Sequence, residues 1–418
     1  MTSMVRKKVL DNGLTIVAER IPFVRSITMG IWIGNGSRYE TKELNGISHF
    51  IEHMMFKGTL KRTSKDIAEQ MDRVGGQINA FTAKEYTCYY TRTLDTHFDL
   101  ALDVLTDMFF HSTFAEEEII KERSVILEEI NMYEDAPEEQ VHDLLQSTIW
   151  DDSLGYPILG TEETLETFRQ KTLKEYMSQR YQPTNTVIAV VGYFEYEELY
   201  EKLEKAFGHW KSLATPIIQS FKTQYTPGII KKEKDIEQVH ICLGFPGPPI
   251  GSKKVYPLSI LNTILGGSMS SRLFQKIREE HGLAYSVYSY PSNYQQAGLF
   301  TIYAGMNPVQ TSRVLELIVE ELTLLKKEFI TQQEIDQTKE QLKSNYMMGL
   351  ESTSGRMNSI GRSQLLLNHI QTPNEIIKKI DQVTKEDIEY LIQEIFDFTQ
   401  MSVSVVGKVK NLKEIPSI

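Results

Sequence analysis

The chain has 418 residues, of which 41% are hydrophobic and 24% are charged, and it carries 45 basic against 56 acidic residues. The net charge of −11 argues against a nucleic-acid-binding protein, because neutralising phosphates requires an excess of lysine and arginine. No segment approaches the roughly 18 apolar residues that span a bilayer, and the length predicts at least two domains.

The N-terminal segment and the cysteines both indicate the cellular compartment of the protein. After a few basic residues the chain passes into residues 9–17, where Asn12-Gly13 predicts a hairpin turn rather than an export signal or a transit peptide. The only cysteines, Cys88 and Cys242, lie in apolar runs far apart in sequence, and we expect buried free thiols. A cytoplasmic protein, most simply from a bacterium, is therefore expected.

The segment His49-Phe50-Ile51-Glu52-His53 is the most informative part of the chain. Two histidines four residues apart on a helix face the same way and can share a metal ion. Glu52 lies beside the second histidine, where a carboxylate can deprotonate a metal-bound water. The order H-x-x-E-H reverses the common zinc-protease motif H-E-x-x-H. Histidines on an amphipathic helix are also common as core or surface residues that bind no metal. A third ligand is therefore needed to distinguish a metal site from such a helix.

A helix and two strands are predicted after this motif. Ser64 can cap a helix that runs to Val74, where a double glycine ends it. Residues 77–83 and 86–91 then form a strand pair around a short turn. The first strand has small and polar residues suited to an exposed edge, to which an extended peptide can be added as another strand. A purely structural hairpin explains the same pattern.

An acidic segment, residues 116–139, offers the third ligand. Glu129 is the candidate, and Glu122 lies nearly two turns before it, so both carboxylates fall on one stripe of a helix. Glu128 points about 100° away around the axis. A solvated helix face is the ordinary explanation of such a run. If the side chains line a cavity instead, they attract basic peptides through their field.

These residues together resemble a known family, the inverzincin metallopeptidases, which include pitrilysin and mitochondrial processing peptidase. The matching positions are His49, Glu52, His53 and, after 75 further residues, Glu129. Residues 49–59 and 125–129 are similar to the processing-peptidase β subunit almost residue for residue. A bacterial homologue resembling the processing proteases is therefore expected.

The resemblance assigns roles around the motif. It implies one Zn²⁺ per chain, held by His49, His53 and Glu129. It makes Glu52 the general base and gives Glu122 a supporting catalytic role. Without the resemblance, Glu122 would be read as part of a charged, solvated helix face.

An internal repeat of about 215 residues organises the chain. Val190-Val191-Gly192 recurs as Val405-Val406-Gly407, and each triplet ends a predicted strand. Residues 114–119 are echoed by residues 330–335, and each segment leads into a long amphipathic helix. Two copies of one α+β unit are the simplest explanation.

The predicted fold class is α+β, with two homologous α/β-sandwich domains. The sequence predicts a zinc-bearing domain at residues 1–211, a linker at residues 212–228 that lacks clear periodicity, and a homologous inactive domain at residues 229–418. The second copy lacks H-x-x-E-H and has Asn345 where the first has Glu129. The resembling family builds a chamber from four such domains, which implies a homodimer that closes as a clamshell.

The second half contains one further candidate pair. Gly266-Gly267 opens a predicted helix that ends near Gly282, and without a P-loop lysine or a dinucleotide fingerprint these glycines favour a helix start. Arg278 and Tyr285 resemble the arginine and tyrosine that the family brings to the active site from its inert domain. They can hold substrate carbonyls and stabilise an oxyanion. A surface arginine and a strand tyrosine are the alternative.

Substrate binding is likewise implied by the resemblance. Asn79, Ala80 and Phe81 in the predicted edge strand would flank the scissile bond. Arg278 and Tyr285 would bind the same peptide and, in a dimer, could act on the zinc of the partner chain.

These expectations combine into one function. We expect a zinc-dependent endopeptidase of short or unfolded peptides, in which a zinc-activated water attacks the peptide bond with Glu52 as base. The alternative is a non-catalytic core or scaffold subunit of the same fold. Such subunits tend to lose the motif, whereas this chain keeps every element of it.

Overall fold

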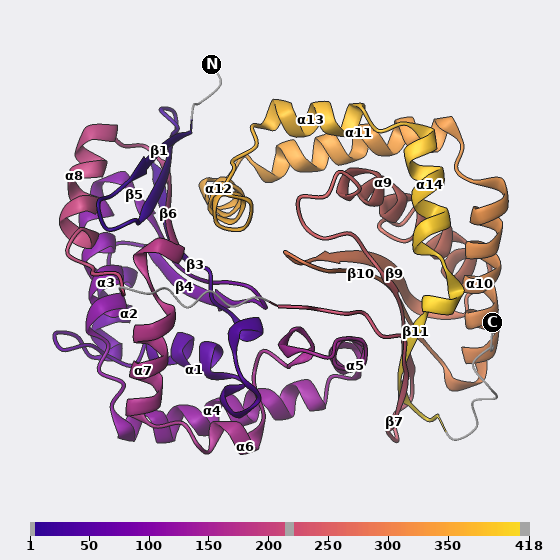
Figure 1. Cartoon of the computed structure of the whole chain (residues 1–418), viewed down its shortest axis with the longest axis horizontal. Coiled ribbons are helices and arrows are strands. Elements are labelled where there is room, and N and C mark those ends of the chain that lie inside the picture. The colour runs from indigo at the N-terminus through magenta and orange to yellow at the C-terminus, as the bar shows by residue number, and fades with distance from the viewer. Residues whose placement is uncertain (1–4, 214–220, 410–418) are drawn as a thin grey trace. The chain divides into compact units, whose positions relative to one another are not determined.

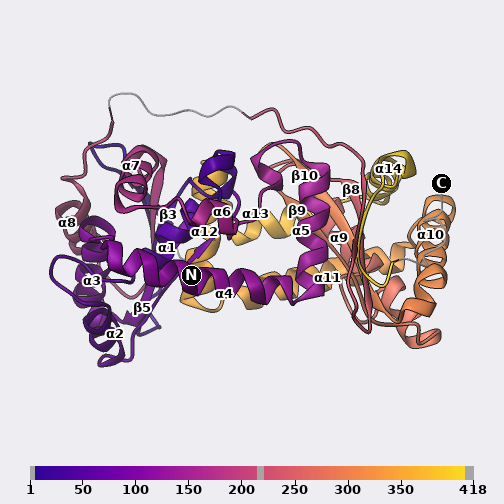
Figure 2. The same cartoon turned by 90° about the horizontal axis from the view of Figure 1, so that it is seen from below.

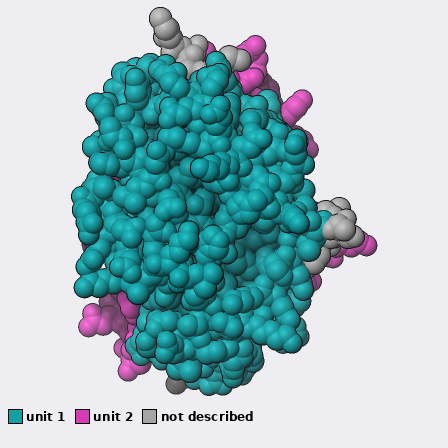
Figure 3. All heavy atoms as spheres, turned by 90° about the vertical axis from the view of Figure 1, so that its left-hand side faces the viewer, with its two compact units in different colours: residues 1–130, 156–220, 347–371 teal, residues 131–155, 221–346, 372–418 magenta. Residues whose placement is uncertain are grey.

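The computed structural model describes residues 5–213 and 221–409 (Figure 1). The chain divides into two compact units, and each unit contains one sheet. Among the described residues, unit 1 comprises residues 5–130, 156–213 and 347–371, and unit 2 comprises residues 131–155, 221–346 and 372–409. Figure 3 shows one face of unit 1 in teal.

Unit 1 is built on a six-stranded sheet in the order β1-β2-β6-β3-β5-β4. The strands are β1 (Arg6–Val9), β2 (Thr15–Arg20), β3 (Ser26–Ile33), β4 (Gln77–Thr82), β5 (Thr87–Leu94) and β6 (Thr186–Gly192). Its helices are α1 (Ile47–Met54), α2 (Ser64–Asp72), α3 (Phe98–His111), most of α4 (Glu116–Glu134), α6 (Glu162–Leu165), α7 (Gln170–Arg180), α8 (Tyr196–Phe207) and α12 (Thr353–Leu367). The main core of the unit lies between one face of the sheet and helices α1, α3, α4, α7 and α8.

Unit 2 is built on a five-stranded sheet in the order β7-β11-β8-β10-β9. The strands are β7 (Ile229–Glu233), β8 (Val239–Pro246), β9 (Ala284–Asn293), β10 (Gly298–Met306) and β11 (Ser402–Gly407). Its helices are α5 (Pro137–Ile149), α9 (Val255–Leu265), a π-helix (Phe274–Glu280), α10 (Thr311–Glu328), most of α11 (Gln332–Gly349), α13 (Pro373–Asp381) and α14 (Lys385–Ile395).

The two sheets repeat one topology, which agrees with the internal repeat in the sequence. The order β2-β6-β3-β5-β4 in unit 1 matches β7-β11-β8-β10-β9 in unit 2. In each sheet the first of these pairs is parallel and the others are antiparallel. The long helices α4 and α11 begin 216 residues apart, at Glu116 and Gln332. The chain therefore contains two copies of one α/β unit, and β1 is an addition to the first.

One helix of each copy packs on the sheet of the other copy. Helices α5 and α12 are equivalent, since they begin at Pro137 and Thr353, again 216 residues apart. Helix α12 nevertheless packs against β3 and β6 of unit 1 (Figures 1 and 2). Helix α5 packs against β8 and β11 of unit 2, where the Ser404 hydroxyl donates to the Val141 carbonyl at 2.7 Å.

The contact of α12 with its sheet is close and partly polar. The Thr28 hydroxyl donates to the Thr353 hydroxyl at 2.9 Å. The guanidinium of Arg356 in α12 pairs with the fully buried carboxylate of Glu19, with an Nε to Oε2 distance of 2.7 Å. A buried carboxylate that lost this partner would leave an unpaired charge in the interior, so the pair fixes where α12 lies on the sheet.

The predicted domains, residues 1–211 and 229–418, each contain one copy of the repeat. The compact units differ from them, because α5 of the first copy belongs to unit 2 and α12 of the second copy belongs to unit 1. Residues 214–220 of the predicted linker lie outside the described residues. Residues 221–228 belong to unit 2, where the Tyr225 hydroxyl donates to the Gly244 carbonyl at 3.0 Å.

Several local predictions can be compared directly. The N-terminal hairpin and the strand pair at β4 and β5 are present, and Gly13 has the positive φ of 89° that its turn requires. Cys88 and Cys242 are buried free thiols. The cap of α2 is Thr63 rather than Ser64, because Thr63 and Asp66 form a reciprocal capping box. Among the described helices, none is both long and apolar enough to cross a membrane.

The packing of α12 generates a stability prediction. A Cβ atom at Gly361 would lie 2.7 Å from Cδ1 and Cε2 of Trp32, whose ring is fully buried. We expect Gly361→Ala to lower the free energy of unfolding by about 1–3 kcal/mol, because the overpacked ring cannot move aside. Denaturant unfolding of both proteins measures the change.

Gly349→Ala is the matched control, since Gly349 ends α11 and a Cβ there would meet nothing within 4 Å. Its unfolding midpoint should be unchanged or slightly higher. Equal stability of the two variants would show that α12 is not closely packed against Trp32 at Gly361.

Candidate metal centre

The position of α1 is set at its first residue. Gly46 precedes the helix with a φ of 91°, in the left-handed region that favours glycine. A Cβ atom there would lie 2.6 Å from the Cα of Gly160, so the two glycine backbones pack directly on each other. Gly46 offers no side chain to cap the helix, and another residue must accept the free N–H groups.

The carboxylate of Glu40 caps α1 in place of a neighbouring side chain. It accepts hydrogen bonds from the backbone N–H of Gly46 at 2.7 Å, from that of Ser48 at 2.8 Å and from the Asn45 amide at 3.0 Å. Burial raises the pKa of Glu40 to about 7, and the hydrogen bonds from Ser48 and Gly46 oppose that rise. This buried cap fixes the direction in which the eight-residue helix leaves the loop.

Helix α1 has one apolar face and one imidazole face. Its core-facing residues are Ile47, Phe50, Ile51 and Met54, all fully buried. This packing turns His49 and His53 to a common side, with ring centroids 4.4 Å apart. The i, i+4 spacing therefore brings the two rings together as the motif predicts.

Helix α4 supplies the acidic partners. Ile119 and Ile126 are fully buried, and the same side of the helix carries Glu122 and Glu129. The Oε2 atom of Glu129 lies 3.8 Å from Nε2 of His49 and 3.7 Å from Nε2 of His53. The exposed side chain of Glu128 points elsewhere, as expected from its place on the helix.

The donor set of His49, His53 and Glu129 fits a zinc ion. One ligand atom from each residue lies within 4.8 Å of the other two, the only such group of three among the described residues. Ligand atoms held at roughly 2.1 Å by a tetrahedral ion are roughly 3.4 Å apart, close to the distances found here. Two imidazoles and a carboxylate leave a fourth position for water or substrate, as in catalytic zinc sites.

A second layer of contacts orients His53. Its Nδ1 atom lies 2.8 Å from Oε1 of Glu122, and Lys57 Nζ lies 2.5 Å from the other oxygen of that carboxylate. An ionised carboxylate only accepts hydrogen bonds, so Nδ1 carries the proton and Nε2 offers its lone pair to a metal. Burial disfavours the charged form of Glu122, but the hydrogen bonds from His53 and Lys57 stabilise that form more strongly. The pKa of Glu122 is therefore lowered.

His49 is the more buried imidazole. Burial and, to a smaller extent, the neighbouring His53 lower the pKa of His49 to about 3, so the ring is neutral at physiological pH. A neutral imidazole is the form that binds metals. Its Nδ1 atom is buried and has no hydrogen-bond partner in the described residues. No hydrogen bond at Nδ1 therefore helps to orient this ring.

Glu52 meets the edge of the sheet. The Thr82 hydroxyl, at the end of β4, donates to Oε2 of Glu52 at 2.5 Å. Burial raises the pKa of Glu52, and the hydrogen bond from Thr82 works against that rise. A carboxylate with a raised pKa suits an acid–base role better than a fully solvated one. The candidate base thus lies between the paired histidines and the edge strand.

Among the described strands, β4 pairs only with β5 and forms one edge of its sheet. Within it, the side chain of Asn79 accepts a hydrogen bond from the Ala80 N–H at 2.8 Å. The ring of Phe81 packs against Trp32, Tyr86 and Tyr90. The ring of Phe81 is therefore not offered to an added strand, and an incoming strand that pairs with the Ala80 N–H would displace the Asn79 side chain.

Arg278 and Tyr285 lie in unit 2, and the structure brings them together. Arg278 belongs to the π-helix and Tyr285 to β9, and the guanidinium carbon lies 5.7 Å from the centre of the tyrosine ring. Tyr285 is 76% exposed, which is unusual for a large aromatic residue in a strand. Both side chains are accessible to a ligand.

Three residues of the centre escaped the sequence analysis: Glu40, Lys57 and Thr82. Lys57 lies four residues after His53 within the recognised segment, so its spacing could have indicated it. Thr82 lies in a predicted strand, but nothing in the sequence of that strand indicated a hydrogen bond from Thr82 to Glu52. Glu40 had no local signal, since its contacts depend on the turn between residues 41 and 46.

The chain is similar to known proteins over most of its length. The family profile described as Insulinase (Peptidase family M16) matches residues 15–162, and that described as Peptidase M16 inactive domain matches residues 167–342. A Bacillus subtilis protein named zinc protease YmxG is 48% identical, over 97% of this chain and 100% of its own. A Streptomyces coelicolor protein also named a zinc protease is 41% identical, over 97% of this chain and 90% of its own.

Solved structures show the same fold. A protease from Helicobacter pylori superposes with a TM-score of 0.90 at 24% identity, covering 97% of this chain and 100% of the other. A peptidase M16 inactive domain from Pseudomonas fluorescens superposes with a TM-score of 0.88 at 18% identity, covering 97% of this chain and 98% of the other.

The contact between His53 and Glu122 predicts a change in metal affinity. We expect Glu122→Gln to weaken Zn²⁺ binding about 10- to 100-fold, because the imidazole loses the partner that orients it. Competition against a chromophoric chelator measures the affinity. Glu128→Gln, an exposed change on the same helix, is the control and should bind as the unmodified protein does. Unaltered affinity in the Glu122 variant would contradict the assignment.

Proposed function

The chain belongs to the insulinase family, peptidase family M16, and we propose that it is a zinc-dependent endopeptidase of short or unfolded peptides. The observation that carries the proposal is the convergence of His49, His53 and Glu129 beside the carboxylate of Glu52. The zinc-protease names of its relatives support the same chemistry.

We propose the following division of labour at the centre. One Zn²⁺ per chain, held by His49, His53 and Glu129, would supply a Lewis acid and lower the pKa of a coordinated water to about 7. Glu52 accepts the proton of the attacking water and delivers it to the nitrogen of the leaving amine. Glu122 keeps the His53 ring in the tautomer that binds metal. Hydrolysis then needs no covalent intermediate.

Substrate binding follows from the edge strand. An extended peptide can be added along Asn79, Ala80 and Phe81, where the Ala80 N–H faces the open edge, and this strand ends where Thr82 contacts Glu52. Backbone pairing favours extended chains over folded proteins, because a folded substrate already uses those groups. Loose side-chain preference is expected, since strand addition draws affinity from the main chain.

Arg278 and Tyr285 are proposed to hold the substrate carbonyl and the developing oxyanion. By analogy with the family, we propose a homodimer in which this pair serves the zinc of the partner chain. The two buried free thiols support a reducing compartment, and we propose the cytoplasm.

The alternative function is a non-catalytic core subunit, which the match of the second half to an inactive-domain profile leaves open. Intact ligand chemistry favours the enzyme. A substitution that keeps the metal but removes the base separates the two.

Glu52→Gln is expected to retain Zn²⁺ and to lose peptide hydrolysis about a hundredfold to ten-thousandfold, because proton transfer in the transition state is removed. Mass spectrometry of a digested peptide library measures cleavage, with a chelator-treated sample beside it. Glu128→Gln should cleave normally. Cleavage by the Glu52 variant at the unmodified rate, or its absence in every sample, would refute a Glu52-dependent peptidase.

Sharing of the site between chains has its own test. A Glu52→Gln chain and an Arg278→Ala chain, each inactive alone, are mixed under conditions that exchange subunits. Partial activity is expected in the mixed dimer, since one of its two sites combines an intact base with an intact arginine. If mixed dimers isolated through two affinity tags stay inactive, the arginine does not act across the chains.

A further inference from the structure

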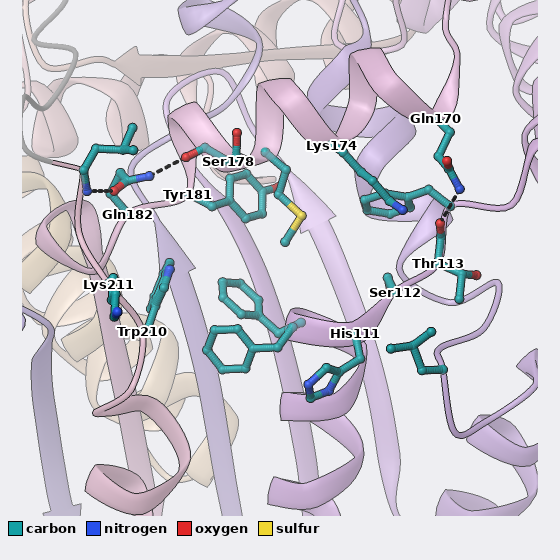
Figure 4. A pocket seen from close by; sticks show the side chains of 16 residues that line it. His111, Ser112, Thr113, Gln170, Lys174, Ser178, Tyr181, Gln182, Trp210 and Lys211 are labelled. Carbon is teal, nitrogen blue, oxygen red and sulfur yellow. Dashed lines mark hydrogen bonds between the residues drawn. The ribbon is translucent and has the colours of Figure 1, made fainter.

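A cavity of about 740 Å³ lies in unit 1, and none of its lining residues belongs to the proposed metal centre. Figure 4 shows it between α7, which carries Gln170, Lys174 and Ser178, and the end of α3 at His111. Trp210 and Lys211, which follow α8, close a third side. The volume is that of a typical small-molecule site.

The inner wall of the cavity is aromatic. The ring of Trp210 lies 5.2 Å from that of Phe109 and 5.7 Å from that of Phe110, and Tyr181 lies 6.0 Å from Phe109. These rings pack on one another edge to face or stacked, so they form a preformed apolar wall rather than separate mobile side chains. Such a wall suits the apolar body of a ligand.

The charges around the cavity have one sign. Among the described residues, the charged side chains that line it are those of Lys174 and Lys211, and no aspartate or glutamate does so. The absence of acidic residues is notable because the whole chain carries 56 of them against 45 basic ones. Within residues 5–213 and 221–409, neither lysine has an ion pair or a hydrogen bond. Both ammonium groups are therefore available to an anion.

His111 is held in place at the same rim. Its Nδ1 atom lies 3.1 Å from Oδ1 of Asp107, which is buried and also accepts a hydrogen bond from Arg62 at 2.8 Å. Since the carboxylate only accepts, Nδ1 carries the proton and Nε2 remains for other contacts. The rim thus combines two free lysines with an oriented imidazole.

We propose that this cavity binds a small amphipathic anion, an aryl or acyl carboxylate whose apolar body packs on the aromatic wall and whose head group pairs with one of the two lysines, Lys174 or Lys211, that lie toward opposite ends of the cavity. Aromatic packing supplies the affinity, and the lysines select the negative charge. The site is independent of the metal centre and of peptide hydrolysis.

Fluorescence titration with anilinonaphthalene sulfonate, an aromatic anion, tests the proposal on the full chain. We expect saturable binding of one probe per chain that decanoate displaces and decanol does not. The double substitution Lys174→Gln and Lys211→Gln should weaken probe binding about tenfold, because the charge contact to the anionic group is lost whichever lysine makes it. Both lysines are on the surface, so the fold should persist, as circular dichroism can verify.

Lys171→Gln is the matched control. Lys171 lies on α7, is not part of the lining and pairs with Glu175 at 3.8 Å. The control should bind the probe as the unmodified chain does. Unsaturable probe binding, equal displacement by decanol, or unchanged affinity in the double variant would each overturn the proposal.

Discussion

The buried carboxylate of Glu40 is the constraint on which the centre depends. An isolated helix of eight residues is unstable in water, so α1 exists because its first N–H groups are capped and its apolar face is packed. The direct approach of Gly46 to Gly160 leaves no room for a side chain that could cap the helix locally. The directions of His49 and His53 therefore follow from a residue outside the recognised motif.

Helix α7 connects the two sites of unit 1. On one face its Tyr176 hydroxyl lies 3.2 Å from the Ser48 hydroxyl, directly before His49 in α1. On another face Lys174 and Ser178 line the cavity. The proposed metal centre and the proposed anion site thus share one structural element while using different side chains. Substitutions in α7 should be assigned to one face or the other before their effects are interpreted.

What the sequence predicted, and what it did not, has a physical basis. The placement of His49, His53 and Glu129 could be predicted because ligand spacing on helices is local geometry and the distant glutamate matched a family pattern. The repeat was visible because equivalent strands keep equivalent residues. The cap of α2 was misplaced by one residue, since Thr63 and Ser64 are both good caps and only the position of Asp66 decides between them. Glu40 could not be predicted, because its contacts depend on a turn that no local pattern describes.

The exchange of α5 and α12 was also invisible in the sequence. Periodicity shows that a helix has an apolar face, but it does not show which sheet covers that face. The exchange sets an order of events on the ribosome. The sheet surface around Trp32 stays bare in the nascent polypeptide until residues 353–367 have been translated, long after the six strands beneath them. Unit 1 therefore cannot complete its packing until residue 367 has been translated, well after its last strand ends at residue 192.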